Sequence, residues 1–242
     1  MGIMAREADH VVGRTTDRMD SRMLYLDSAD TAELADLLGT GLFAGVTTNP
    51  TILDRAGRSV ADLPELYALT REHGGTFFAQ ATGADADELR TASVAILEIS
   101  GDIVVKLPAT QPGLTVAAEL TAAGTRVLVT AVYHPSQQLL AAAAGAQFIA
   151  PYVGRSTDAG FDGIELVREM AALSGPGFPR ILAASLRGIE VVSHVAQAGA
   201  HDLTMSTAVA RTLFSHELTG RAVAEFEDVA ASSLARHEAA SS

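Results

Sequence analysis

Short apolar runs alternate with amphipathic stretches along almost the whole of this chain, and that alternation limits the folds open to it. Eight runs have strand character, and each is followed by apolar residues at helical spacing. Parallel strands need a crossover connection, usually a helix, so alternating strands and helices predict a parallel sheet. Eight such units in 242 residues favour a (β/α)8 barrel, or TIM barrel.

The strands are expected at residues 24–26, 44–48, 76–80, 103–107, 126–130, 147–152, 180–185 and 201–204. Helix boundaries carry separate signals, such as the capping-box pattern of Asp30 and Glu33 and the glycine at position 124. A doubly wound open sheet is the rival architecture. It rarely needs eight even units, and no glycine-rich dinucleotide motif follows the first strand.

The domain organisation expected from the sequence has three parts. Residues 1–22 are polar, mixed in charge and without the apolar core of a signal peptide, so we interpret them as a disordered leader. Residues 23–235 are expected to form the barrel with an extra C-terminal helix, which carries Val223, Phe226 and Val229. Residues 236–242 are expected to be a flexible tail.

Composition excludes several function classes. The net charge of −12 argues against nucleic-acid binding, because phosphates need a broad basic surface. No apolar run reaches the roughly 18 residues of a membrane-spanning helix. The absence of cysteine excludes disulfides and thiolate metal sites and fits a cytoplasmic protein. The seven histidines are scattered without metal-ligand spacing, so no metal site is expected.

Lys106 is the only lysine in the chain, and every other basic position is arginine. It directly follows Ile103–Val105, a β-branched run typical of a buried strand. Arginine stays protonated and cannot act as a nucleophilic amine, whereas a desolvated lysine loses its proton more easily. The sequence therefore predicts a Schiff-base lysine. The alternative is a structural lysine that is paired with a carboxylate.

The predicted strands end in polar residues, and in a barrel those ends meet around the active site. Asp27 and Tyr152 are the candidate general acids or bases beside Lys106. The tyrosine is expected to act through a water that Gln80 and Thr130 hold. Asp commonly ends strands for purely structural reasons, but glutamine and tyrosine are not turn formers.

A second set of strand-end residues is suited to binding the substrate. Asn49, with its neighbour Thr47, is expected to bond substrate hydroxyl groups. Ser185, Arg155 and Arg187 are expected to bind a phosphate, because the loops after the last strands of barrels often hold one. The alternative for the two arginines is a surface ion pair.

Several motifs resemble those of the transaldolase family, and most of all its fructose-6-phosphate aldolase branch. The likeness runs from about Met23 to Phe226 in the right order and spacing. The motifs are Leu24-Tyr-Leu-Asp27, Gly45-Val-Thr-Thr-Asn-Pro50, Phe78-Ala-Gln80, Asp102-Ile-Val-Val-Lys-Leu-Pro108, Thr130-Ala-Val-Tyr133, Ala150-Pro-Tyr-Val-Gly-Arg155 and Leu182-Ala-Ala-Ser185.

The resemblance implies a class I aldolase barrel that needs no cofactor and uses Lys106 as its Schiff-base lysine. It also separates two activities, because true transaldolases have Glu, Asn, Ser and Phe at four positions that differ here. Those positions are Gln80, Leu128, Ala150 and Tyr152, and all four look like the aldolase branch. The tyrosine hydroxyl can supply the proton for direct aldol cleavage.

One segment departs from the aldolase pattern. Leu186-Arg187-Gly188 stands where that branch has Phe-Lys-Thr, and Arg187 is more like the phosphate-binding arginine of transaldolases. Members of the family are ring-shaped pentamers stacked into decamers, with the C-terminal helix docked on a neighbour. The resemblance therefore implies a homo-oligomer, with residues 221–231 in the docking helix.

The expected function is reversible cleavage of fructose 6-phosphate to dihydroxyacetone and glyceraldehyde 3-phosphate. The first alternative is a transaldolase that transfers a dihydroxyacetone unit between sugar phosphates. A barrel that binds sugar phosphates without catalysis is a second alternative, although no member of the expected constellation is damaged. A phosphate-barrel isomerase would not need the lone lysine.

Overall fold

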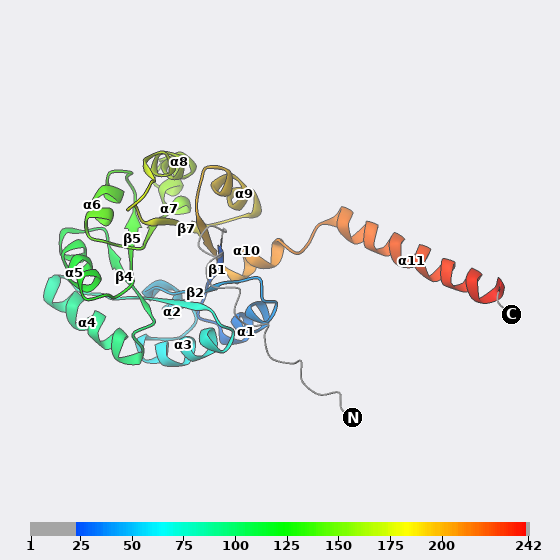
Figure 1. Ribbon diagram of the computed structural model, residues 1–242, viewed down its shortest axis with the longest axis horizontal. Helices are drawn as coiled ribbons and strands as arrows, with labels where there is room; N and C mark the ends of the chain where they lie inside the picture. Colours follow the sequence, from blue (N-terminus) through cyan, green and yellow to red (C-terminus); the bar gives the residue numbers. More distant parts are fainter. Residues whose placement is uncertain (1–22, 241–242) are drawn as a thin grey trace, which may run out of the picture.

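The computed structural model describes residues 23–240, so the predicted leader at residues 1–22 lies outside the described residues. Eight parallel strands form a closed barrel in which neighbours follow the order of the chain and β1 pairs with β8. Figure 1 shows helices arranged around the outside of these strands. The predicted (β/α)8 barrel is therefore confirmed.

The elements follow the expected alternation. The strands are β1 (Met23–Asp27), β2 (Gly45–Thr47), β3 (Thr76–Gln80), β4 (Val104–Pro108), β5 (Val127–Val132), β6 (Phe148–Pro151), β7 (Arg180–Leu186) and β8 (Asp202–Met205). The helices are α1 (Thr31–Gly39), α2 (Pro50–Arg55), η1 (Val60–Asp62, a 3-10 helix), α3 (Leu63–Glu72), α4 (Ala86–Ile99), α5 (Gln111–Ala122), α6 (Gln137–Ala143), α7 (Val153–Asp158), α8 (Gly163–Leu173), α9 (Ile189–Gln197), α10 (Thr207–Thr212) and α11 (Glu217–Ala240). The short helices α2 and α7, which directly follow strand ends, were not expected.

Two hydrophobic clusters divide the core between the inside and the outside of the barrel. Successive side chains of a strand point to opposite faces, so Val104 packs in the inner cluster while Val105 packs in the outer one. Aromatic rings fill much of the interior, with the Phe78 ring 5.3 Å from the rings of both Tyr25 and Phe148. The barrel is thus a packed core with room for chemistry only at its end.

The same alternation carries polar side chains into the end of the barrel. A residue two positions after an inward-facing apolar residue also faces inward, and five strands finish this way. The residues placed in this way are Asp27, Gln80, Lys106, Thr130 and Tyr152.

Two strands contain irregularities near their C-terminal ends. The pairing register shifts between Val129 and Val132 in β5 and between Ala183 and Leu186 in β7. Within each shift one residue has a left-handed backbone, with φ of 56° at Ala131 and 61° at Ser185. Such bulges bend a strand and redirect its side chains, and these two lie beside the end of the barrel. Both strands run beyond their predicted ends.

An ion pair closes the barrel where its last strand meets its first. The fully buried carboxylate of Asp202 in β8 accepts hydrogen bonds from Arg180 Nε and Nη2 of β7, each at 2.8 Å. It also accepts one from the backbone N–H of Met23 in β1 at 3.0 Å. These contacts join three strands at one point, and loss of one partner of such a pair typically costs about 3–5 kcal/mol.

The long helix α11 extends away from the barrel, as Figure 1 shows. It continues to Ala240 and so covers most of the segment expected as a tail. Its apolar side chains are open to solvent, and Phe226 is 69% exposed. Within residues 23–240, no helix has both the length and the apolar character needed to cross a membrane.

Candidate active site

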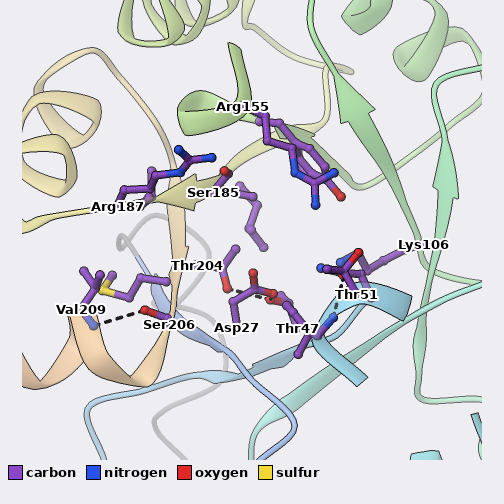
Figure 2. Close-up of a pocket in the computed structure, with 18 of the residues that line it drawn as sticks. Asp27, Thr47, Thr51, Lys106, Arg155, Ser185, Arg187, Thr204, Ser206 and Val209 are labelled. Carbon is purple, nitrogen blue, oxygen red and sulfur yellow. Dashed lines mark hydrogen bonds between the residues drawn. The ribbon is translucent and has the colours of Figure 1, made fainter. Parts of the chain in front are cut away.

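A cavity of about 410 Å³ lies where the strands of the barrel finish. The side chains labelled in Figure 2 converge on it from β1, β2, β4, β7 and β8, from segments that follow these strands, and from α7 after β6. Most of the predicted site residues line this cavity: Asp27, Thr47, Asn49, Lys106, Tyr152, Arg155, Ser185 and Arg187. Gln80 and Thr130 do not line it, although both lie at strand ends beside residues that do.

Lys106 is buried in the wall of the cavity and is only 4% exposed. Its Nζ donates a hydrogen bond to the backbone carbonyl oxygen of Thr48 at 2.7 Å. Among the described residues it forms no salt bridge, so the structural alternative of a carboxylate-paired lysine finds no partner there. Burial lowers the pKa of Lys106 to about 8, against the opposing charge of Asp27. A useful share of the amine is therefore uncharged near neutral pH.

Asp27 is linked to two threonine hydroxyls across neighbouring strands. Its Oδ1 accepts a hydrogen bond from Thr47 at 2.6 Å, and the Thr47 hydroxyl lies 2.7 Å from that of Thr204. Burial raises the pKa of Asp27, while Lys106, Thr47 and Arg155 act in the opposite direction. A carboxyl group with a raised pKa beside an amine with a lowered one is suited to passing protons.

Tyr152 is buried on the opposite side of the barrel from β2, just after β6. Its hydroxyl is 3.0 Å from the hydroxyl of Thr130, which donates to it. Burial is the main cause of a raised Tyr152 pKa, so the phenol is protonated at neutral pH. The Thr130 contact gives that hydroxyl a defined direction within the site.

Gln80 lies next to Lys106, because the two residues are paired in register between β3 and β4. Its Oε1 is buried and has no hydrogen-bond partner among the described residues. A buried acceptor of this kind is costly to leave unpaired, and a water is a suitable partner. This geometry fits the predicted role of Gln80 in holding a water.

Asn49 has a structural role as well as its place in the cavity. It is the N-cap of α2, and its Oδ1 accepts a hydrogen bond from the backbone N–H of Ile52 at 3.1 Å. The cap leaves the amide nitrogen of the side chain as a donor for a substrate hydroxyl. Capping thus fixes the orientation of the side chain at the edge of the cavity.

Arg155, Ser185 and Arg187 lie along one side of the cavity, and Asp27 lies on the other (Figure 2). Arg187 is paired with Asp158, with 2.5 Å between Nη1 and Oδ1, and both side chains are more than half exposed. The alternative reading of this arginine as a member of an ion pair is thus partly right. Because such an exposed pair is weak, it does not prevent Arg187 from binding a phosphate.

Four further polar residues line the cavity but were not singled out from the sequence: Thr51, Arg55, Thr204 and Ser206. Thr204 carried a signal, since it ends the eighth predicted strand in the same way as the other site residues. Arg55 carried none, because it reaches the cavity from the end of the unexpected helix α2. Within the described residues, no group of three or more His, Cys, Asp or Glu is arranged to hold a metal ion.

Comparison with solved structures supports the barrel assignment. A thiamine phosphate pyrophosphorylase from Pyrococcus furiosus superposes with a TM-score of 0.58 over 80% of this chain and 89% of that one. The two sequences are only 18% identical, so the likeness concerns the fold alone.

Comparison with known sequences identifies the family. A probable transaldolase of Hyphomonas neptunium is 40% identical over 205 residues, which cover 84% of this chain and 94% of the relative. A probable transaldolase of Rhodospirillum centenum is 38% identical over 84% of this chain and 88% of the relative. The model of the transaldolase/fructose-6-phosphate aldolase family matches residues 24–241. The buried lysine and the polar strand ends around it thus stand in a chain that belongs to the transaldolase/fructose-6-phosphate aldolase family.

Proposed function

We propose that this protein is a Schiff-base aldolase that reversibly cleaves fructose 6-phosphate to dihydroxyacetone and glyceraldehyde 3-phosphate. Family membership supports an enzyme of the aldolase or transaldolase type. The observation that carries the finer proposal is Lys106, a buried amine in the wall of a cavity with a pKa lowered to about 8. Such an amine is available as a nucleophile at neutral pH.

The proposed chemistry begins when the uncharged amine of Lys106 adds to the C2 ketone of the open-chain sugar. Loss of water gives an iminium ion. A base then removes the proton of the C4 hydroxyl, and the electron pair of the C3–C4 bond moves to the iminium nitrogen as the aldehyde leaves. The remaining enamine takes a proton at C3, and water hydrolyses the iminium ion to release dihydroxyacetone and the free amine.

Two residues are placed to move the protons in this sequence. We assign the proton exchange at C4 and C3 to Tyr152, whose hydroxyl is held by Thr130 at 3.0 Å and which is protonated at rest. Its oxygen takes the C4 proton as its own proton passes, through water, to the Asp27 carboxylate left by the dehydration step, and the reverse transfer delivers a proton to C3. We assign the loss of water from the lysine adduct to Asp27, because burial raises its pKa and lets it carry a proton. Substrate hydroxyls would bond to Asn49, and the phosphate would bind the arginine side of the cavity.

A trapping experiment tests the central step. Incubation with dihydroxyacetone and borohydride should reduce the iminium ion and leave a stable adduct, and mass spectrometry should locate it on Lys106. The variant Lys106→Arg should keep the far-ultraviolet circular dichroism of the parent and lose turnover of fructose 6-phosphate. Undiminished cleavage by this folded variant would rule out the proposal.

A transaldolase is the second candidate, and the names of the relatives favour it. The two activities differ in what happens to the three-carbon unit. An aldolase releases free dihydroxyacetone without any added aldose phosphate, whereas a transaldolase releases almost none. We expect Tyr152→Phe to shift the products from cleavage towards transfer; an unchanged ratio would count against the role given to Tyr152.

A barrel that only binds sugar phosphates remains the alternative from a different class. Affinity for fructose 6-phosphate without any trapped adduct would support it. A cytoplasmic location is part of our proposal, because phosphorylated sugars are charged and do not cross membranes unaided.

A further inference from the structure

The two arginines beside Ser185 are held in different ways. The guanidinium of Arg187 is paired with the carboxylate of Asp158. Arg155 has no salt bridge among the described residues; instead its Cζ lies 4.9 Å from the centre of the Tyr152 ring. A guanidinium that lies over an aromatic ring keeps its N–H donors in its own plane. The charge and donors of Arg155 therefore remain available to an anion while the guanidinium lies over the tyrosine ring.

Tyr152 is held by contacts of three different kinds. The Tyr133 ring packs edge-on against it, with centroids 5.9 Å apart and an interplanar angle of 74°. Thr130 bonds its hydroxyl, and Arg155 covers its ring. Tyr152 and Arg155 are three residues apart, at the start of α7, and their side chains are in contact. A shift of one side chain therefore changes the packing of the other.

We propose that Arg155 is a positioning residue that links the anion on the arginine side of the cavity to the orientation of the Tyr152 ring. The guanidinium lies over the tyrosine ring and also lines the cavity, so an anion that fixes the arginine also fixes the phenol. This inference rests on the proposed function, because Tyr152 moves protons there. It gives the substrate phosphate a role in the chemical step in addition to its role in affinity.

The charges around Tyr152 determine the direction in which a bound anion should shift the pKa of Tyr152. Asp27 of β1 and Tyr133 after β5 raise the pKa of Tyr152, as burial does, whereas the Thr130 hydrogen bond and the charge of Arg155 lower it. An anion on Arg155 offsets its positive charge. Bound phosphate should therefore raise the pKa of Tyr152, and removal of the guanidinium should do the same.

Kinetics with an acceptor that carries no phosphate separates positioning from phosphate affinity. We compare aldol addition of dihydroxyacetone to glyceraldehyde and to glyceraldehyde 3-phosphate in Arg155→Met, Arg155→Lys and the control Arg168→Met. Arg168 is an exposed arginine of α8 outside the cavity. We expect Arg155→Met to lower kcat with glyceraldehyde about tenfold, Arg155→Lys to restore part of it, and the control to change nothing.

The fall in kcat caused by Arg155→Met should depend on the presence of the Tyr152 hydroxyl. In a Tyr152→Phe background, Arg155→Met should have little further effect on kcat with glyceraldehyde. If Arg155→Met only raises the KM for glyceraldehyde 3-phosphate and leaves kcat with glyceraldehyde unchanged, then Arg155 only binds phosphate and the inference is wrong. The inference is also wrong if the effects of Arg155→Met and Tyr152→Phe on kcat with glyceraldehyde are additive.

A second measurement does not need turnover. The chain has four tyrosines, so 3-fluorotyrosine labelling gives four fluorine NMR signals, and Tyr152→Phe identifies one of them. We expect inorganic phosphate to move the Tyr152 midpoint to higher pH by about half a unit or more, and Arg155→Met to remove this response. If phosphate binds but the titration midpoint of Tyr152 does not move, the inference is wrong, even if aldol cleavage is observed. A moved midpoint without any cleavage would support the link and contradict the proposed function.

Discussion

At position 106 an amine is enclosed by the barrel interior, and its hydrogen bond goes to the carbonyl oxygen of Thr48. A carbonyl oxygen accepts a hydrogen bond from a neutral amine as well as from an ammonium ion, whereas a carboxylate partner would favour the charged form. Burial therefore lowers the lysine pKa with no directly paired carboxylate to cancel it, and Asp27 opposes that effect only in part.

The pH dependence of turnover should follow from this amine. With a Lys106 pKa of about 8, only about a tenth of the amine is uncharged at pH 7, and most of it is uncharged at pH 9. We expect kcat/KM for fructose 6-phosphate to rise about tenfold between pH 7 and pH 9 and then level off. A rate that still increases tenfold per pH unit above pH 9 would show that the lysine has an ordinary pKa.

The same burial predicts a cost in stability. Below pH 8 the folded protein holds a buried ammonium ion, while the unfolded chain holds a solvated one. We expect Lys106→Met to raise the free energy of unfolding at pH 7 by about 1–3 kcal/mol.

The pH dependence of unfolding tests whether the buried ammonium ion is the cause of this difference in stability. The folded state binds fewer protons than the unfolded state between about pH 8 and the ordinary lysine pKa of 10.5, so the stability of the parent rises across that window. The difference between parent and variant, measured by urea unfolding, should therefore be constant below pH 8 and shrink above it. A gap that widens above pH 8 would contradict the pKa assignment.

Three residues show which parts of the site could be predicted from the sequence and which could not. Lys106 stood out because it is the sole lysine and ends an apolar strand, and the structure places it in the cavity. Arg55 could not be found, because its helix α2 is too short to give a periodic pattern. The pairing of Arg187 with Asp158 joins residues 29 positions apart, and nothing in the local sequence indicates it.

At the scale of elements, the strand order was predictable and the strand ends were not. Alternating apolar runs identify strands. Alanine and serine rarely adopt a left-handed backbone, so the sequence gives no sign of the positive φ angles at Ala131 and Ser185. The bulge in β7 also involves a neighbouring element. At β7 the bulge is fitted against α7, where a Cβ on Gly154 would lie 2.4 Å from the Ser185 carbonyl oxygen.

This contact makes Gly154→Ala a test of how β7 and α7 build the phosphate side. The added methyl group would also lie 2.9 Å from Arg187 Nε, so both Ser185 and Arg187 must shift. We expect the KM for fructose 6-phosphate to rise at least fivefold and the unfolding free energy to fall by about 1–3 kcal/mol. The matched control is Gly175→Ala, since a Cβ there meets nothing within 4 Å. Equal behaviour of the two variants would show that the packing at Gly154 is not critical.

Over the whole molecule, charge is distributed unevenly. The chain carries a net charge of −12, yet the cavity brings together Lys106, Arg55, Arg155 and Arg187 with Asp27 as its carboxylate. A cavity lined by charges of one sign concentrates oppositely charged ligands. An anionic ligand in this cavity would thus meet a local charge opposite in sign to that of the protein as a whole.

The helix α11 leads to a prediction about assembly, which remains a proposal. Its apolar residues Val223, Phe226 and Val229 recur at three-residue spacing and are 48%, 69% and 60% exposed. An apolar stripe on a helix that extends from its own barrel is best buried against another subunit. We expect the full chain to sediment as a homo-oligomer, with a mass five or ten times 25.1 kDa.

Substitution of the stripe should break this assembly without unfolding the barrel, because α11 contributes nothing to the barrel's buried core. We expect the double variant Val223→Ser, Phe226→Ser to give a smaller species in analytical ultracentrifugation, with unchanged circular dichroism of the barrel. The control Asp228→Ser changes an exposed residue of the same helix outside the apolar stripe and should keep the parent's mass. A parent chain that sediments as a monomer would contradict the prediction, since the stripe would then be exposed without a partner.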